Sequence, residues 1–441
     1  KPAPIKVYSD DDEDYDNERD DVIVVDHAEL SPIAKISSNT YDLQNLKNIM
    51  SSNFDKNLTY FGNNLQPKQV NQFIQLLTPH LIEKGPISSI KLILHTIISM
   101  MNRDHNLASE IIKTKFFLSL PTRDDNYIDD CIDCYKILFT QYQKNLTEND
   151  TDNIMNLLKR RPRSVLCLFS SYVTANIDHD WSIIDILIKG YNIVLNSSEG
   201  VLLLSVFYYI MVTNELFAKA KGSKIIDIFN AFLKSNDQKT VIVAMNGLIQ
   251  FHARIEQNVI PYLTQYLHDG VLWSHTLRYL ASDDFTKSSQ KGIKVTEELI
   301  RALVFRANEN KLAVLILLRI ASTTEGSRLL LSYPQWMIIS DEHPHKAFQI
   351  FGVLFKNKNN RGTISISDQF PYFLKNLVLK CDDDFYFAAI PSILRRAFAS
   401  ISQKMGKRLV KCLTQSGFLS SYVEKVISKN DISAYSHLLI V

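Results

Sequence analysis

The chain has 441 residues, of which 46% are hydrophobic, and a formal net charge of +2. It contains 13 Gly and 13 Pro, too few for an all-β chain, which needs many turn residues. The longest apolar run, 200–212, is shorter than the about 20 residues that cross a bilayer, so we expect a buried helix there. The five cysteines form no secreted framework, which indicates a reducing compartment.

The first thirty residues differ from the rest of the chain. They contain eleven Asp and Glu against three Lys and Arg, a net charge of −8, whereas the remaining residues carry +10. A segment this acidic and this poor in apolar residues cannot bury enough surface to fold by itself. We therefore predict a disordered acidic tail or linker over 1–30, a poorly defined lead-in over 31–60, and a folded region over 61–441.

A short apolar cluster lies in the acidic tail. Two aspartates precede Val22, Ile23, Val24 and Val25, and a β-favouring run of this kind can add a strand to the edge of a partner's sheet. The pattern resembles the SUMO-interacting motifs, which implies a ubiquitin-like modifier as a partner. Ser9, just before an acidic run, resembles a site for acid-directed kinases and is a candidate for modification.

Other interpretations of this cluster stay open. It is a chance grouping of apolar residues, or it packs on the chain's own first repeat. A further alternative is that the acidic tail folds back onto the basic body and masks a groove there, because opposite charges attract the two parts.

From about residue 40 onward the apolar residues recur at helical spacing, and segment 224–251 shows this most clearly. Two apolar helical stripes in this segment flank the polar residues 234–237, which favour a turn and a helix cap. The small residues Ala244 and Gly247 predict that a neighbouring helix approaches the second of these helices closely.

This arrangement resembles the armadillo repeat and the related HEAT repeat. Segment 311–331 is similar to the second and third helices of an armadillo unit, with Glu325 and Gly326 at the corner between them. Helices that end in a polar turn recur at nine intervals of 34 to 48 residues, close to the length of armadillo and HEAT units. The three tryptophans are not placed once per unit, as they are in the armadillo proteins that carry nuclear import cargo, so we do not expect that activity.

The resemblance implies an all-α fold, a right-handed α-solenoid or armadillo-like superhelix of roughly nine to ten repeats. The last interval is long, and we expect an extra turn or loop around Gln403 to Lys407. The chain begins with Lys1, and residues 433–441 have the pattern of a helix cut off within its unit. We therefore expect a piece of a longer protein that ends within its last repeat.

Residues that could hold a metal or perform catalysis are scattered along the chain. Cys131 and Cys134 have no further ligands nearby in the sequence, the run 341–345 fits a turn that starts a helix, and His179 has no recognisable nucleophile. Cys134 and Cys167 lie in apolar runs and are expected to be small buried residues. Phosphate-binding, dinucleotide-binding, zinc-protease, serine-hydrolase and protein-kinase motifs are absent. We expect no catalytic site, no metal and no cofactor.

Basic residues concentrate at two places. The densest cluster is Lys159, Arg160, Arg161 and Arg163, which is a binding site for an acidic peptide, a nuclear address, or a solvated turn between two helices. Further cations could line one face near the C-terminal end: Arg395, Arg396, Lys404, Lys407, Arg408 and Lys411. Aromatic residues do not alternate with these cations, which argues against nucleic-acid binding.

We therefore expect a non-enzymatic scaffold or adaptor that binds other proteins or peptides along a concave helical surface. Its expected location is the cytoplasm, with the nucleus as the alternative, and we expect no membrane insertion. Two alternatives stay open. The chain is the regulatory helical-repeat region C-terminal to the catalytic domain of a larger enzyme such as a protein kinase, or it is a nuclear transport or chromatin-linked adaptor.

Overall fold

The protein is all-helical, and the described residues contain no β-strand. The structure is a computed structural model, and it describes residues 58–59, 62–83, 86–114, 116–139, 148–175, 182–282, 294–339, 344–380 and 384–429. None of the helices in these ranges is long and apolar enough to cross a bilayer.

Several sequence predictions fall outside these ranges. They are the acidic tail with Ser9 and Val22, Ile23, Val24 and Val25, the lead-in up to residue 57, His179, residues 341–343 and the end of the chain from 430.

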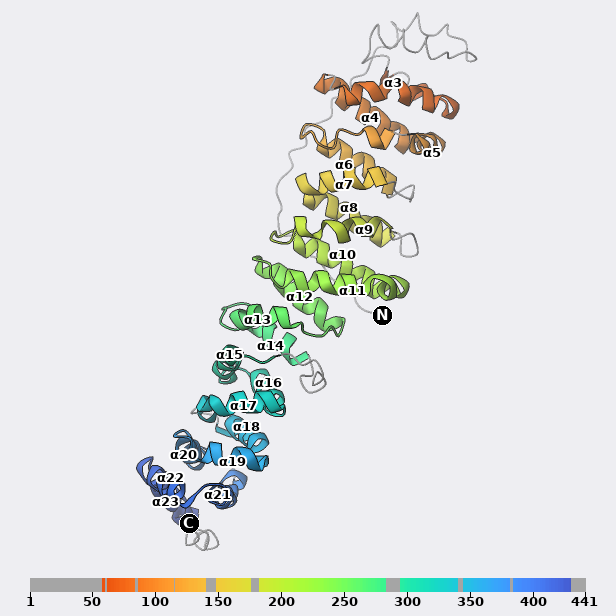
Figure 1. The fold of residues 1–441 in the computed structure, drawn as a ribbon. Helices are drawn as coiled ribbons and strands as arrows, with labels where there is room; N and C mark the ends of the chain where they lie inside the picture. The colour runs from red at the N-terminus through yellow and green to blue at the C-terminus, as the bar shows by residue number, and fades with distance from the viewer. Residues whose placement is uncertain are drawn as a thin grey trace, which may run out of the picture.

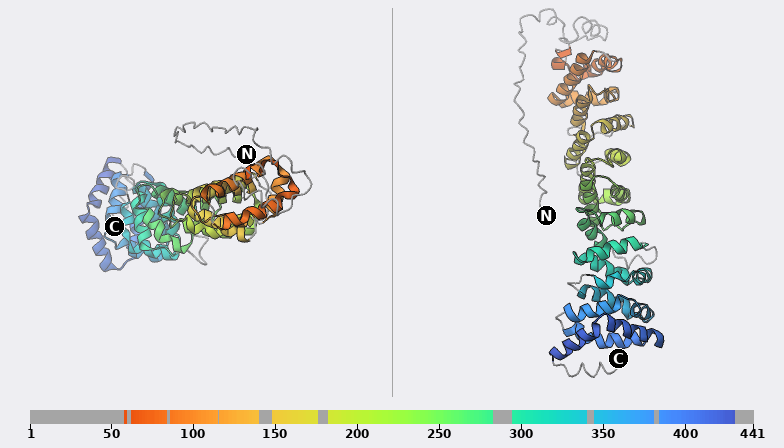
Figure 2. Two further views of the ribbon diagram at one scale, coloured as in Figure 1. Left: turned by 90° about the horizontal axis from the view of Figure 1, so that it is seen from above. Right: turned by 90° about the vertical axis from the view of Figure 1, so that its left-hand side faces the viewer.

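The helices form two rows that run side by side along one long axis, in the order of the sequence (Figures 1 and 2). We call the first row A. It contains α3 (Val70–Ile82), α5 (His105–Lys113), α7 (Glu148–Arg160), α9 (Ser182–Gly190), α11 (Glu215–Phe232), α13 (Ile260–Tyr266), α15 (Glu297–Ala307), α17 (Thr324–Ser332), α19 (Lys358–Ser365) and α21 (Asp384–Phe398).

The second row, row B, alternates with row A along the chain. It contains α4 (Ile87–Arg103), α6 (Ile128–Ile137), α8 (Pro162–Ala175), α10 (Gly200–Thr213), α12 (Gln238–Gln250), α14 (Trp273–Ser282), α16 (Lys311–Ala321), α18 (Pro344–Lys356) and α20 (Phe370–Lys380). Each row B helix contacts the next one in the row, and most of these contacts are more extensive than the corresponding contacts in row A. Row B is therefore the more tightly packed side of the stack.

Short 3-10 helices and a final helix pair complete the described part. The 3-10 helices are η3 (Pro67–Gln69), η4 (Phe116–Ser119), η6 (Tyr191–Ile193), η7 (Gln257–Val259) and η8 (Pro334–Ile338). The stack ends with α22 (Gln403–Gln415) and α23 (Phe418–Lys429), both of which contact α20. The extra turn or loop predicted around Gln403 to Lys407 is wrong, because these residues form the first turns of α22, capped by the Ser402 hydroxyl.

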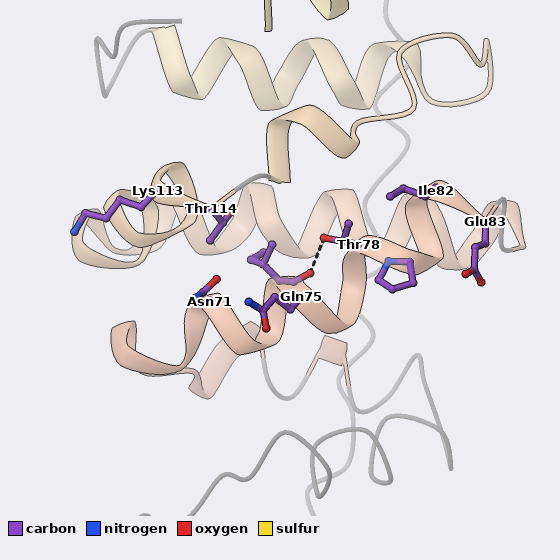
Figure 3. A pocket seen from close by; sticks show the side chains of 9 residues that line it. Asn71, Gln75, Thr78, Ile82, Glu83, Lys113 and Thr114 are labelled. Carbon is purple, nitrogen blue, oxygen red and sulfur yellow. Dashed lines mark hydrogen bonds between the residues drawn. The ribbon is translucent and has the colours of Figure 1, made fainter. Parts of the chain in front are cut away.

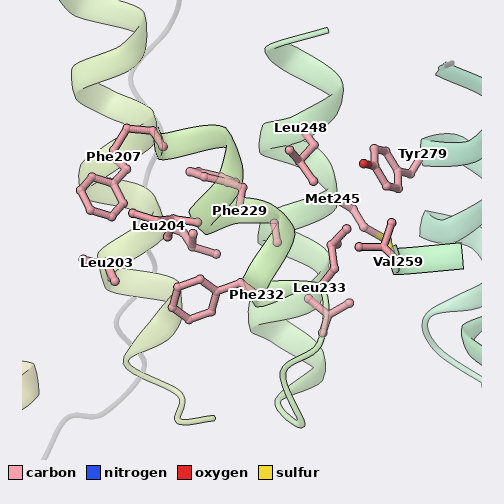
Figure 4. Close-up of a cluster of buried hydrophobic side chains, with 14 of the residues drawn as sticks. Leu203, Leu204, Phe207, Phe229, Phe232, Leu233, Met245, Leu248, Val259 and Tyr279 are labelled. Carbon is pink, nitrogen blue, oxygen red and sulfur yellow. The ribbon is translucent and has the colours of Figure 1, made fainter. Parts of the chain in front are cut away.

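A continuous apolar core lies between the two rows. Figure 4 shows one part of it, where leucine and phenylalanine side chains of α10 and α11 meet Met245 and Leu248 of α12, and Tyr279 of α14 follows. These side chains are completely or almost completely buried. Each helix covers its apolar stripe with the helices before and after it, so the core extends along the whole stack instead of gathering at a centre.

The turns between the rows follow from capping residues in the sequence. The predicted turn at 234–237 ends with Asp237, whose carboxylate accepts a hydrogen bond from the Thr240 backbone N–H at 2.8 Å and starts α12. At the predicted corner in 311–331, the Thr323 hydroxyl caps α17 by accepting from the Gly326 N–H at 3.1 Å. Gly326, in the first turn of α17, packs against the carbonyl of Ile320 in α16. Both predicted pairs of helices are present, but the corner in 311–331 lies at Ser322 and Thr323, so Glu325 and Gly326, predicted at the corner, belong to the first turn of α17.

Basic side chains connect successive helix pairs. Each donates a hydrogen bond to a backbone carbonyl at the C-terminal end of a helix that lies 38 to 47 residues earlier in the chain, where the helix dipole favours a positive charge. The pairs are Arg306 with Leu267 at 2.7 Å, Arg319 with Ala281 at 2.6 Å, Lys346 with Ala307 at 3.1 Å, and Lys425 with Val378 at 2.6 Å. These bonds satisfy carbonyls that a helix end leaves without an intrahelical partner.

The close approach predicted at Gly247 is confirmed, and it makes this glycine sensitive to substitution. A Cβ atom at Gly247 would overlap the ring edge of Phe229, which packs edge-to-face on Phe251 at 5.3 Å. We expect Gly247→Ala to lower the free energy of unfolding by about 1–2 kcal/mol, because overpacking outweighs the better helix propensity of alanine. At Gly352, in α18, an added Cβ atom would meet open space, so Gly352→Ala is expected to raise the free energy of unfolding by about 0.5–1 kcal/mol. Urea unfolding of both variants checks the opposite signs.

Candidate binding surface

The predicted basic cluster lies at the corner between α7 and α8, as the turn interpretation required. Lys159, Arg160, Arg161 and Arg163 are all exposed. Two of them meet carboxylates of the preceding segment: Arg160 Nη1 lies 2.8 Å from an Asp125 oxygen, and Arg161 Nε lies 3.7 Å from an Asp129 oxygen. The cluster is thus partly neutralised within the chain. Arg163 is the residue of the cluster that lies within α8.

The predicted C-terminal cations lie on the last described helices. Lys404, Lys407, Arg408 and Lys411 are exposed and share one face of α22, opposite its buried Leu409 and Leu413. Arg408 lies 3.3 Å from Asp368. Arg395 and Arg396 are exposed at the C-terminal end of α21.

The thiols are arranged differently from the prediction in one case. Cys131 and Cys134 are completely buried in α6, and burial is the main cause that raises the pKa of both thiols. Cys167 is exposed on α8, although it was predicted to be buried, because the helix packs through Leu166, Leu168 and their neighbours and turns Cys167 outward. A metal needs deprotonated thiols, and within the described ranges no group of three or more His, Cys, Asp or Glu could hold one.

The difference in burial predicts selective alkylation. At pH 8, iodoacetamide is expected to modify Cys167 at least about a hundredfold faster than Cys131 or Cys134, because only an accessible thiolate reacts and the raised pKa keeps the buried thiols protonated. Mass spectrometry of tryptic peptides over time measures the three rates. In denaturant the rates are expected to converge, and equal rates in the native protein would contradict the burial of α6.

Two hollows open near the first helices. The larger, of about 640 Å³, lies between α3 and the C-terminal end of α5 on row A (Figure 3). Pro79 inside α3 has no N–H to donate to the Gln75 carbonyl, which therefore has no partner in the helical ladder here. The Thr78 hydroxyl donates to the Ile74 carbonyl at 2.8 Å. The lining mixes aliphatic, amide and hydroxyl groups with Glu83 and Lys113. Lys113 pairs with Glu110 at 2.6 Å, outside the lining.

The smaller hollow, of about 560 Å³, lies between α4 and α6 on row B. Its lining contains His95, whose Nε2 lies 2.9 Å from Asp130 Oδ1, and Ser99, one turn further along α4. A Ser-His-Asp site needs a hydrogen bond from the hydroxyl to the imidazole, and no such bond joins Ser99 to His95 in the described structure. The His95 side chain is also largely open to solvent.

The most unusual surface extends along row B. Seven successive helices of this row, from α8 to α20, contain no Asp or Glu, although these make up 47 of the 441 residues. The same helices contain nine Lys and Arg: Arg163, Lys239, Arg278, Lys311, Arg319, Lys346, Lys356, Lys375 and Lys380. In row A, by contrast, four of the six helices that lie between them in the sequence, α9, α11, α15 and α17, contain at least one acidic residue. We call the outward surface of the seven helices the acid-free face.

Exposed apolar side chains accompany the cations on this face. Tyr372 and Leu379, one face of α20, are 53% and 51% exposed, and Val353 of α18 and Leu315 of α16 are also exposed. Six of the nine cations are exposed as well: Arg163, Lys239, Arg278, Lys311, Lys356 and Lys380. The face therefore offers an exposed cation on six of its seven helices, all but α10, and exposed apolar side chains mainly in its C-terminal half.

Comparison with family models, with curated proteins and with solved structures finds no match for this chain.

Proposed function

We propose that this protein is an α-solenoid of the armadillo and HEAT type that acts as a non-enzymatic scaffold, and that its acid-free face binds an extended acidic segment of a partner protein. The observation that carries the proposal is the absence of Asp and Glu from seven successive row B helices. A surface of one charge sign raises the local concentration of an oppositely charged partner and repels the wrong ones.

The arrangement of the helices supports the solenoid. Stacked helix pairs of similar length produce two rows of helices in chain order. They also produce cations that cap carbonyls at a nearly constant separation in the sequence. In a curved stack the more tightly packed row lies on the inner side, and row B packs more tightly. The acid-free face is then the inner surface, which helical-repeat proteins commonly use for binding.

A protein segment suits this face better than a nucleic acid. The six exposed cations are distributed at about one per helix, and packed helices lie about 8–10 Å apart, which is sparse beside the phosphate spacing of a nucleic acid strand. Exposed Leu315, Val353 and Leu379 add aliphatic contacts, which favour apolar side chains over stacked bases.

Fluorescence anisotropy tests the proposal with three labelled probes: acidic peptides with interspersed Val and Ile, basic peptides of equal length, and oligo(dT). We expect only the acidic peptides to bind tightly, with affinity that falls between about 0.05 and 0.5 M salt. The variant Lys239→Glu/Arg278→Glu/Lys311→Glu is expected to lose this binding. The matched control Lys224→Glu/Arg328→Glu/Lys358→Glu reverses three exposed charges on row A and should retain it. Tighter binding of oligo(dT), or no binding of any probe, would overturn the proposal.

The two alternative roles concern the context of the chain. A regulatory region beside a kinase domain and a nuclear adaptor would both use such a surface, and no feature of the described residues favours either over a scaffold.

A further inference from the structure

The exposed apolar side chains of the acid-free face lie mainly where α14, α16, α18 and α20 succeed one another, and each of these helices also has one exposed cation. The four helices contact each other in this order, and they contain seven Lys and Arg and no acidic residue. Leu315, Val353, Tyr372 and Leu379 are exposed on three of them. An occupant that complements this region needs several carboxylates beside a short apolar run.

The chain contains such a segment itself. Residues 10–14 are five consecutive acidic residues, and residues 20–26 place four aliphatic side chains between aspartates. We propose that residues 9–26 of this chain occupy the part of the acid-free face formed by α14, α16, α18 and α20, and so compete with the partner. This inference rests on the proposed function, since it assigns a first occupant to the same surface.

The length of the intervening chain permits this contact within one molecule. From residue 26 to Leu58 there are 32 residues, which span up to about 105 Å at about 3.3 Å per residue. From α4 to α18 there are seven steps along row B, or about 55–70 Å at 8–10 Å per packed helix. The segment therefore reaches the proposed region with chain to spare.

The chemistry of the two parts matches in both charge and polarity. The exposed cations Arg278, Lys311, Lys356 and Lys380 can pair with the carboxylates of 10–14 and 20–21, while the aliphatic run covers Tyr372 and Leu379. Individual exposed ion pairs are weak, so the contact depends on several pairs together with the apolar burial. Phosphorylation of Ser9 would add further negative charge next to the acidic run and strengthen it.

A synthetic peptide of residues 5–30, fluorescently labelled, measures the competition in the full-length chain. A tail-neutralised variant changes the four aspartates in 10–14 to Asn and Glu13 to Gln, so that its own tail no longer competes. We expect the peptide to bind this variant at least about fivefold more tightly than the wild type, because the wild-type site is already occupied most of the time. A peptide with phosphorylated Ser9 is expected to bind more tightly still.

Two further variants in the tail-neutralised chain locate the site. Lys356→Glu/Lys380→Glu is expected to abolish peptide binding, whereas Lys224→Glu/Arg328→Glu, with the same change of charge on row A, is expected to leave it unchanged. Circular dichroism verifies that both fold. Equal affinity of wild type and tail-neutralised chain, or no binding to either, would refute the tail as occupant, while the acidic-peptide test of the proposed function, repeated in the tail-neutralised chain, stays independent of it.

Carbodiimide cross-linking of an equal mixture of ¹⁴N and ¹⁵N full-length chains distinguishes a tail that docks on its own molecule from a tail that docks on a second copy. Links between carboxylates of 10–21 and Lys356 or Lys380 within a single isotope are expected, and they should disappear at high salt. Links that join the two isotopes would assign the occupant to a second copy and overturn docking within one molecule.

Discussion

Replacing Trp336 with alanine is expected to lower the free energy of unfolding by about 3–5 kcal/mol, the largest effect of any single truncation that we predict. Trp336 lies in η8, between α17 and α18, and is completely buried. Its indole N–H donates to the Leu330 carbonyl at 2.9 Å. The short helix η8 contacts α17, α18 and α20, so the cavity left by the ring would loosen both rows at once.

The effect of Trp336→Ala is expected to be local in the stack. Because each helix contacts only its neighbours, the loss should weaken the C-terminal helices before the N-terminal ones. Hydrogen exchange read by mass spectrometry should therefore show faster exchange over 324–380 and nearly unchanged exchange over 87–175. Ile366→Ala, an exposed apolar residue at the end of α19 and outside the acid-free face, is the control and should leave both regions unchanged. Uniform loss of protection along the whole chain would contradict a stack of local contacts.

Much of the fold could be predicted from the sequence because its determinants are local. The apolar stripes in 224–251 and the polar residues between them identify α11 and α12, since periodicity and helix capping depend on residues a few positions apart. Gly247 pointed to a close approach because only a missing side chain makes room for Phe229.

The prediction failed where a helix packs on one side only. Helix α22 buries just Leu409 and Leu413, and its polar start with Gly406 has the composition of a loop. Cys167 was predicted to be buried from the apolar residue types around it in the sequence. Its burial depends instead on the direction in which its side chain leaves the helix. Periodicity over 162–175 would have placed Cys167 on the outward face beside Ser171 and Thr174.

The acid-free face could not be recognised from the sequence, although every residue of it is visible there. Its seven helices alternate with row A helices, and four of the six between them, α9, α11, α15 and α17, contain acidic residues, so the absence of acids from row B does not show in the continuous sequence. The face becomes visible only when every second helix is assigned to one row, because that row then contains the cations without the acidic residues. The predicted cluster at 159–163 was conspicuous because it is contiguous, yet Asp125 and Asp129 partly neutralise it.

Arg306 is the second position where a large effect is expected. Its side chain is only 8% exposed, although arginine is seldom buried, and its Nε donates to the Leu267 carbonyl at 2.7 Å. Glu309 accepts from Nη1 at 2.7 Å, and the guanidinium lies 4.7 Å from the ring centre of Trp273. One residue thus caps α13, pairs within its own turn and stacks on the first residue of α14.

Arg306→Ala is expected to lower the free energy of unfolding by about 2–4 kcal/mol, because it removes a charge-assisted hydrogen bond and a cation–π contact and leaves a helix-end carbonyl without that donor. Arg306→Lys should recover only part of this, since an ammonium group lacks the planar fork that serves the carbonyl and the carboxylate together. Arg328→Ala, an exposed arginine on row A helix α17, should leave the urea midpoint unchanged. If Arg306→Ala unfolds at the wild-type midpoint, these contacts do not hold the pairs together, and apolar burial alone connects α13 to α15.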